Sequence, residues 1–234
     1  MYSDNIANTP VPLYNKKIVK RVAIFLSMVV AFGLVAVANI ASASTTKTAD
    51  QVVTETTNKM LAALKQEQQL IKQQPERVYE LANQIIMPHV DSQRMSLWAL
   101  GKHWRKATDE QKRLFPIQFR NLILRTYATA LSEYTDETVH FLPLRAEKDA
   151  TEVTVRTLIK RNAGPSIPVS YRMHQVANEW KIYDISIDGI SLTNNYRRSF
   201  SSEIRRHGLD GLIQKLARKN RTLVAKNSLL ASNS

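Results

Sequence analysis

The sequence contains no cysteine among its 234 residues. This absence excludes disulfide bonds, cysteine nucleophiles and thiolate metal sites, and it is compatible with an oxidising compartment. Glycine and proline are also scarce, with 6 and 8 residues, which favours long regular elements over a loop-rich fold. The apolar content of 44% supplies enough side chains for the core of one good domain or two small ones.

Short motifs of familiar enzymes are absent as well. The sequence has no G-x-S-x-G turn, no phosphate-binding P-loop, no glycine-rich dinucleotide turn and no H-E-x-x-H metal motif. The five histidines are scattered without the spacing of metal ligands, so structural or surface roles are favoured for all of them: His89, His103, His140, His174 and His207. We therefore predict no cofactor and no metal.

The N-terminal segment has the pattern of a secretory signal peptide. Four basic residues between positions 16 and 21 precede an apolar run from Val22 to Ala38, and Ala41 and Ala43 then provide small residues at the spacing that a signal peptidase requires. We predict a signal peptide over residues 1–43. Because the apolar run is close to the shortest membrane-spanning helix, a retained anchor is the alternative.

Positive charge is in excess, with a formal net charge of +13. Removal of residues 1–43 takes away four of the 33 basic residues and one of the 20 acidic ones, which leaves +10. Such a charge favours nucleic acid or an anionic membrane surface as a partner. Export and the absence of nucleic-acid-binding motifs argue against nucleic acid. Anionic lipid headgroups or acidic envelope proteins are the better partners for this charge.

Apolar residues recur at helical spacing after a short polar linker over residues 44–50. The pattern predicts helices from Gln51 to Gln73, from Pro75 to a stop at Pro88, and from Asp91 to about Lys106, with Asp91 as a cap of the third helix.

A fourth helix is predicted to start at Thr108, because Thr108 to Gln111 has the form of a capping box. This helix is apolar on nearly every side, which indicates that most of its surface is buried. Pro116 within it removes one backbone hydrogen bond and is expected to bend the axis.

From Glu137 the apolar residues alternate with polar ones, which is the period of a strand. Four such runs, joined by short loops, predict an antiparallel meander whose last strand holds Tyr183, Ile185 and Ile187. One face is expected to meet the helices and the other to meet water. The residues predicted on the water-facing side of the second and third strands are Glu152, Arg156, Lys160, Arg172 and His174.

Two further helices are predicted after the strands, which makes the fold class α+β. Thr193 or Asn194 can cap the first, Gly208 can end it, and a short second helix follows over residues 209–216. The segment 221–234 has no strong pattern and is predicted to be a disordered tail.

Two long segments resemble the MlaC family, the toluene-tolerance type of periplasmic phospholipid carrier. The first is WKIYDISIDGISLTNNYRRSF (Trp180 to Phe200), followed by Gly208-Leu209-Asp210. The second is PHVD (Pro88 to Asp91) with LGKHWRKATDEQ (Leu100 to Gln111). Since the segments occur in the family's order, the resemblance predicts one phospholipid-binding domain over residues 44–220.

The resemblance implies N-terminal helices packed on a curved four-stranded antiparallel sheet, followed by two C-terminal helices, around an apolar lipid cavity. It also implies a carrier in the periplasm without catalysis. Its partners would be phospholipid, an outer-membrane lipoprotein and porin complex and an inner-membrane ABC transporter complex, and its role the maintenance of outer-membrane lipid asymmetry. The expected wall of the cavity, in which each residue could equally be plain core, comprises Phe119, Leu122, Tyr127, Val155, Val169, Tyr171, Tyr183, Ile185 and Ile187.

Two alternatives stay open. One is a small periplasmic enzyme of isomerase-like fold with Asp184 or Asp188 as its base, because a curved sheet packed by helices can hold a carboxylate in an apolar pocket. An exposed carboxylate, or one that caps the following turn, is the plainer interpretation of both residues. The other alternative is an envelope scaffold anchored by residues 22–38.

Overall fold

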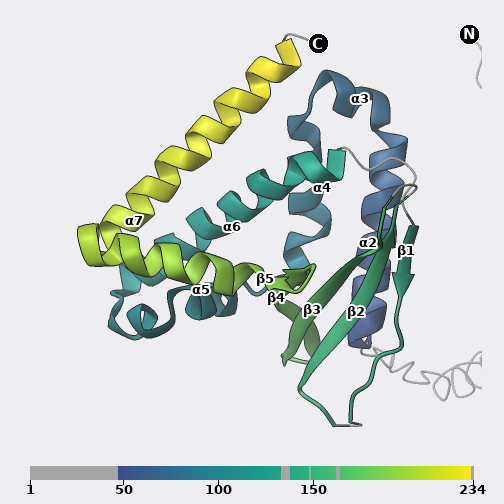
Figure 1. The fold of residues 1–234 in the computed structure, drawn as a ribbon, viewed down its shortest axis with the longest axis horizontal. Helices are drawn as coiled ribbons and strands as arrows, with labels where there is room; N and C mark the ends of the chain where they lie inside the picture. The colour runs from purple at the N-terminus through teal and green to yellow at the C-terminus, as the bar shows by residue number, and fades with distance from the viewer. Residues whose placement is uncertain (1–46, 133–137, 148, 162–163, 233–234) are drawn as a thin grey trace, which may run out of the picture. The chain divides into compact units, whose positions relative to one another are not determined.

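The computed structural model describes residues 47–132, 138–147, 149–161 and 164–232 (Figure 1). The predicted signal peptide over residues 1–43 and its apolar run lie outside these ranges. Within the described part of the chain, no helix combines the length and the apolar character needed to cross a membrane.

Helices form the first half of the described chain. They are α2 (Ala49–Gln66), α3 (Gln68–Gln73), α4 (Glu76–Ile85), the 3-10 helix η1 (Met87–His89), α5 (Ser92–Leu100), the 3-10 helix η2 (Gly101–Lys106) and α6 (Asp109–Ser132). The first predicted helix is divided at Glu67. The third ends at Leu100, because Gly101 has a φ of 53°, outside the right-handed helical region, and the chain continues as η2.

Side-chain caps begin α5 and α6 as predicted. Asp91 Oδ1 accepts the Arg94 N–H of α5 over 2.8 Å. At the start of α6, Thr108 Oγ1 accepts the Gln111 N–H over 3.2 Å, and Gln111 Oε1 accepts the Thr108 N–H over 3.1 Å. The capping box is therefore confirmed, with both orphan N–H groups satisfied.

The helix α6 continues through Pro116. A proline at this position has no N–H to donate to the carbonyl of Lys112, one turn earlier. The side chain of Gln93 supplies a substitute, with 3.4 Å between Gln93 Nε2 and the Lys112 oxygen. A contact between α5 and α6 thus partly replaces the missing helical bond.

A five-stranded antiparallel sheet follows, with its strands in sequence order. The strands are β1 (Thr138–Phe141), β2 (Glu152–Lys160), β3 (Ile167–Val176), β4 (Glu179–Ile187) and β5 (Ile190–Ser191). The four predicted strands are present as a meander. The two-residue β5 is an additional strand that the alternation did not reveal, since two residues are too short to show a period.

The C-terminal part is α7 (Leu192–Ser232), which is interrupted at Gly208 with φ 69° and ψ 177°. Figure 1 shows the change of direction within α7. Gly208 thus separates two helical segments as predicted. The second extends to Ser232, beyond the predicted short helix over residues 209–216 and into the segment 221–234 that was predicted to be a disordered tail. The predicted cap at Thr193 or Asn194 is wrong, because the helix begins at Leu192 and Ser191 Oγ accepts the Asn194 N–H over 3.2 Å.

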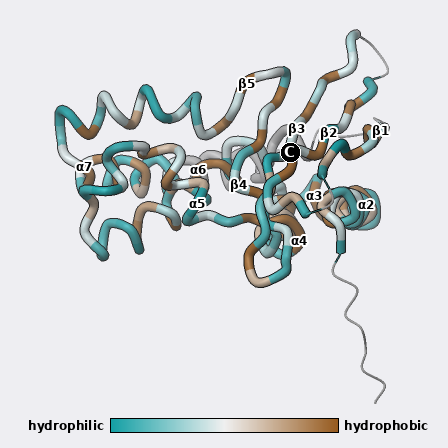
Figure 2. The backbone as a smooth tube through the Cα atoms, turned by 90° about the horizontal axis from the view of Figure 1, so that it is seen from below, coloured by the Kyte–Doolittle hydropathy of each residue, from teal (hydrophilic) through white to brown (hydrophobic). Residues whose placement is uncertain are grey.

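Three groups of buried apolar side chains hold these elements together. The largest joins α5, α6 and α7, the second joins α2, α4 and α6, and the third joins α2 to the sheet. Figure 2 shows hydrophobic and hydrophilic positions alternating along the helices, as expected when each buries one side. The sheet is therefore covered on one face by α2, and α5 packs against β4.

Candidate functional site

A cavity of about 420 Å³ lies between the sheet and the helices α2, α4 and α6. This volume is in the range of small-molecule sites. The helices contribute Val53, Met60, Leu61, Ile86, Ile123 and Leu124, among others. The sheet contributes Val139, Ile159, Ile167, Val169, Tyr171, Ile182, Ile185 and Ile187. The wall is therefore almost entirely apolar, which suits a hydrocarbon ligand.

The pairing of β2 with β3 explains why so many apolar residues meet on one face. Val155 lies opposite Tyr171, and Ile159 lies opposite Ile167. Because side chains alternate between the two faces of a strand, these odd-numbered positions all point to the side of α2 and α6. The alternation in the sequence therefore encodes the apolar wall directly.

Five of the nine residues expected to line the cavity are on its wall. They are Tyr127, Val169, Tyr171, Ile185 and Ile187. Burial is the main cause that raises the pKa of the Tyr127 and Tyr171 phenols, so both remain neutral and add no charge to the wall.

The other four residues lie elsewhere. Phe119 and Leu122 are buried among α5, α6 and α7, where the ring of Phe119 meets that of Phe200 edge-on at 5.2 Å between centroids. Ile123 belongs to the same buried group, one helical turn after Phe119, and also reaches the cavity wall, which Phe119 and Leu122 do not. Val155 points to the same side as the wall, but it belongs to the core between α2 and the sheet.

Tyr183 leaves the cavity face because β4 contains a bulge. Arg172 pairs with Asp184, whereas the next residue, Met173, pairs with Ile182, so Tyr183 is an extra residue without a partner. A bulge of this kind reverses the alternation of faces along the strand. Tyr183 accordingly stacks on Trp98 of α5, with 6.0 Å between the ring centroids.

Met60 of α2 and Ile86, which directly follows α4, were not expected on the wall. Their helical spacing predicts correctly that they face inward. Spacing alone does not distinguish a filled interior from a cavity, because it reports the direction of a side chain and not what lies opposite to it.

Two cations interrupt the apolar wall, Arg120 and Arg161. The guanidinium of Arg120 donates to Asn83 Oδ1, and Arg161 donates from Nε and Nη2 to the Pro165 oxygen over 3.2 and 3.1 Å. In the described ranges neither forms an ion pair with a carboxylate. The cavity wall thus carries net positive charge.

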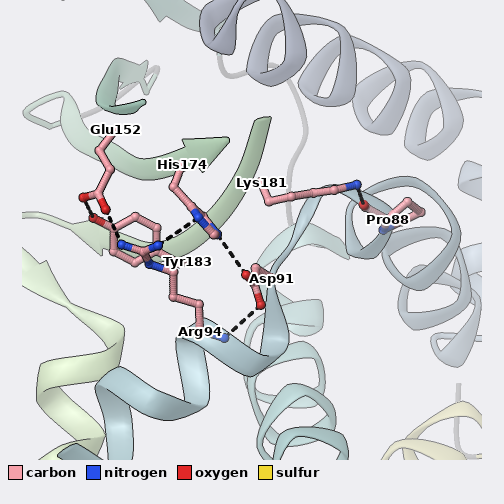
Figure 3. A network of polar contacts seen from close by, with 7 residues as sticks. All are labelled: Pro88, Asp91, Arg94, Glu152, His174, Lys181 and Tyr183. Carbon is pink, nitrogen blue, oxygen red and sulfur yellow. Dashed lines mark hydrogen bonds and ion pairs between the residues drawn. The ribbon is translucent and has the colours of Figure 1, made fainter. Parts of the chain in front are cut away.

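A polar network occupies the opposite face of the sheet (Figure 3). Within it, His174 Nε2 lies 2.9 Å from Asp91 Oδ2, and His174 Nδ1 lies 2.9 Å from Arg94 Nη1. Because arginine can only donate, Nδ1 accepts and Nε2 carries the hydrogen. Arg94 also pairs with Glu152. Both ring nitrogens of His174 are therefore engaged, and neither is available to a substrate.

The network corrects one expectation about this face. Glu152, Arg156 and Lys160 are exposed, as predicted. His174 is only 7% exposed, because α5 covers this part of the sheet and supplies Asp91 and Arg94. Alternation along a strand therefore predicts which residues form the polar face, but it does not show which part of that face a helix covers.

The two candidate catalytic carboxylates lie away from the cavity wall. Asp184 is 1% exposed; its Oδ1 accepts the Thr193 N–H over 3.1 Å, and its Oδ2 accepts the Ser191 hydroxyl over 2.7 Å. It therefore caps the start of α7. Asp188 is exposed in the turn after β4, with a φ of 51°. In the described residues, no three or more acidic or histidine side chains gather as a metal site would require.

The fold and the cavity define a class of α+β binding protein with an apolar pocket between a meander sheet and its helices. The chain belongs to the MlaC family, since the family model described as MlaC protein matches residues 54–218.

Individual relatives agree with this assignment. The chain is 31% identical over 165 residues to the toluene tolerance protein ttg2D of Pseudomonas putida, covering 70% of this chain and 76% of that protein. It is 24% identical over 162 residues to the intermembrane phospholipid transport system binding protein MlaC of Haemophilus influenzae, covering 68% and 76%.

A solved structure shares the fold. It is the phospholipid-binding protein of Ralstonia solanacearum in complex with a phospholipid, with a TM-score of 0.70 and 35% identity. The match covers 76% of this chain and 99% of that one. The α+β architecture expected from the sequence is thereby confirmed.

Proposed function

We propose that the protein is a periplasmic carrier that holds the acyl tails of a phospholipid in the cavity between the sheet and α2, α4 and α6. The observation that carries this proposal is the apolar wall, to which β2, β3 and β4 all contribute. A relative of the same fold was solved with a phospholipid, which supports it. The expected domain over residues 44–220 and the signal peptide over residues 1–43 belong to the same proposal.

Exposure of acyl chains to water has a large free-energy cost, which the cavity avoids. Each methylene removed from water contributes about 0.8 kcal/mol, so two tails of ordinary length represent on the order of 20 kcal/mol. A carrier must therefore cover the tails throughout transit, whereas the headgroup can stay in water. The positive charge of Arg120 and Arg161 at the wall is compatible with a phosphate near the mouth.

Exchange of the lipid requires partner complexes. We propose that the carrier exchanges lipid with an outer-membrane lipoprotein and porin complex and with an inner-membrane ABC transporter complex, and so helps maintain lipid asymmetry. The name of the Haemophilus influenzae relative, intermembrane phospholipid transport system binding protein, supports this role. Because tight burial of two tails makes spontaneous release slow, each partner must open the cavity or offer a competing apolar path.

Native mass spectrometry of the protein purified without detergent tests the proposal. We expect phospholipid at near-stoichiometric occupancy, identified after extraction. The variant Ile185→Trp fills the cavity wall and should lose most of the lipid, whereas Ile190→Trp, at a 60% exposed position five residues later, should retain it. A protein that carries no lipid and takes none from vesicles would remove the proposal.

The position of the two carboxylates argues against the enzyme alternative, and the anchored-scaffold alternative can be tested by experiment. The isomerase-type reading needs Asp184 or Asp188 in a pocket, and neither lines the cavity. The anchored scaffold requires that residues 22–38 be kept. N-terminal sequencing of the protein from cells distinguishes it, since a start near Ser44 shows that the segment is removed.

A further inference from the structure

A second depression, of about 350 Å³, lies over α5, η2 and the start of α7. We call it the aromatic-basic depression and define it by Leu97, Trp98, Lys102, Trp104, Arg105 and Arg197. Trp98 stacks on Tyr183, which projects from the sheet face opposite to the lipid cavity. The depression is therefore a separate feature from the cavity.

Its floor is apolar and open to solvent. Leu97 is 44% exposed, although its neighbours Met95, Ala99 and Leu100 in α5 are buried. Trp98 and Trp104 are half-buried and present the rest of the apolar surface. A contiguous patch of exposed apolar side chains indicates a binding surface, whereas single exposed apolar residues are common on any protein.

Its rim is basic. Lys102 and Arg105 are exposed, and neither forms an ion pair in the part of the chain that the structure covers. Arg197 is held in place because its Nε donates to the Trp98 carbonyl over 2.8 Å. Burial, followed by the charges of Lys102, Arg205 and Lys106, lowers the pKa of His103 in η2.

Cations and rings alternate from the rim toward the sheet. The guanidinium of Arg172 lies 4.6 Å from the ring centroid of Trp98 and 4.9 Å from that of Tyr183, and the guanidinium of Arg94 lies 4.7 Å from the Tyr183 centroid. The carboxylate of Glu152 forms an ion pair with Arg94 and accepts a hydrogen bond from the Tyr183 hydroxyl (Figure 3). Among the residues that the structure describes, Arg172 and Arg197 at the Trp98 end form no ion pair with a carboxylate, so this end keeps its positive charge.

We propose that the aromatic-basic depression docks onto the anionic headgroups of a phospholipid bilayer. Tryptophan rings favour the headgroup level of a membrane, and an exposed leucine gains by entering the acyl boundary. Lysine and arginine near the surface are attracted by anionic headgroups. This surface goes beyond lipid carriage, because it acts on the loaded and the empty protein alike and would hold either at the membrane.

Flotation of the purified protein with vesicles tests the docking surface. We expect binding to vesicles that contain phosphatidylglycerol, little binding to vesicles of phosphatidylcholine alone, and weaker binding as salt is raised. Each near-surface cation contributes a factor of about five, so Lys102→Gln with Arg105→Gln should weaken binding roughly 25-fold. Leu97→Ser should weaken it further without changing charge.

The matched control removes two exposed cations elsewhere, Lys65→Gln with Lys72→Gln in α2 and α3. Binding that falls equally in both pairs would show a general charge effect and overturn the proposal, as would a wild-type protein that ignores anionic vesicles. If vesicles are ignored but the Lys102/Arg105 pair is needed for lipid transfer to a partner complex, the surface belongs to an acidic protein instead. Lipid occupancy by native mass spectrometry should be unchanged in all variants, and a bare wild-type protein would contradict the carrier function and not the docking.

Discussion

Tyr183 and Ile185 lie on opposite faces of β4 although they are two residues apart. Ile185 lines the cavity, whereas Tyr183 stacks on Trp98 and donates to Glu152 Oε2 over 3.1 Å. The bulge at Tyr183 also turns Asp184 to the outer face, opposite Arg172. One extra residue in the strand therefore gives the sheet an apolar face for cargo and a polar face for helix attachment and capping.

The capping role of Asp184 predicts a loss of stability without a loss of cargo. Asp184→Asn removes the charge that faces the start of α7, and we expect the free energy of unfolding to fall by about 1–2 kcal/mol. Asp188→Asn, in an exposed turn where asparagine tolerates the positive φ, should change it by less than about 0.5 kcal/mol. Denaturant unfolding measures both. Equal effects of the two substitutions would contradict the capping role of Asp184. We expect Asp184→Asn to retain its lipid, because Asp184 acts in helix capping and not in the cavity.

Asp91 serves two groups at once, which makes its removal costly. Asp91→Ala removes the cap of α5 and leaves the buried Nε2–H of His174 without an acceptor, so we expect a loss of about 2–3 kcal/mol. Asp109→Ala is the matched change at the start of α6, where the side chain is fully exposed and 3.8 Å from Lys112. That variant should lose less than about 1 kcal/mol. Similar melting temperatures for the two variants would rule out the double role of Asp91.

Pro116 predicts a stabilising substitution. Pro116→Ala restores an N–H for the Lys112 carbonyl, and we expect a gain of about 1–2 kcal/mol. The contact of Gln93 with that carbonyl should then become redundant. A double-mutant cycle shows this directly, because Gln93→Ala should destabilise the natural protein but have almost no effect beside Pro116→Ala. Additive effects of the two substitutions would contradict the proposed compensation.

The environment of His103 predicts a pH dependence. Burial of its ring, followed by the charges of Lys102, Arg205 and Lys106, lowers its pKa below the ordinary 6.5. The folded state therefore binds this proton less readily than the unfolded state, so the contribution to stability is present above pH 6.5 and is lost as the pH falls through the folded pKa. An NMR titration should find the His103 midpoint below 6.5, and Lys102→Gln should move it upward. A midpoint unchanged by Lys102→Gln would show that the charge of Lys102 does not contribute to the lowered pKa.

The order of elements could be predicted from local patterns, because capping boxes, proline and glycine positions and the change of period are all short-range signals. The caps at Asp91 and Thr108 and the break at Gly208 are examples. The site was predicted only in part. The bulge at Tyr183 depends on how β3 and β4 pair, and the burial of His174 depends on where α5 packs against the sheet. Neither can be predicted from the alternation of residues along a single strand.

The meander places its two shortest strands at the two edges of the sheet. The edge strand β1 has 4 residues and the edge strand β5 has 2, whereas β2, β3 and β4 between them have 9, 10 and 9. Unpaired backbone groups at a sheet edge are a template on which another chain can add a strand, and short edges limit this hazard. The sheet that forms the cavity wall therefore offers only short edges to a second copy of the chain, which limits self-association by strand addition.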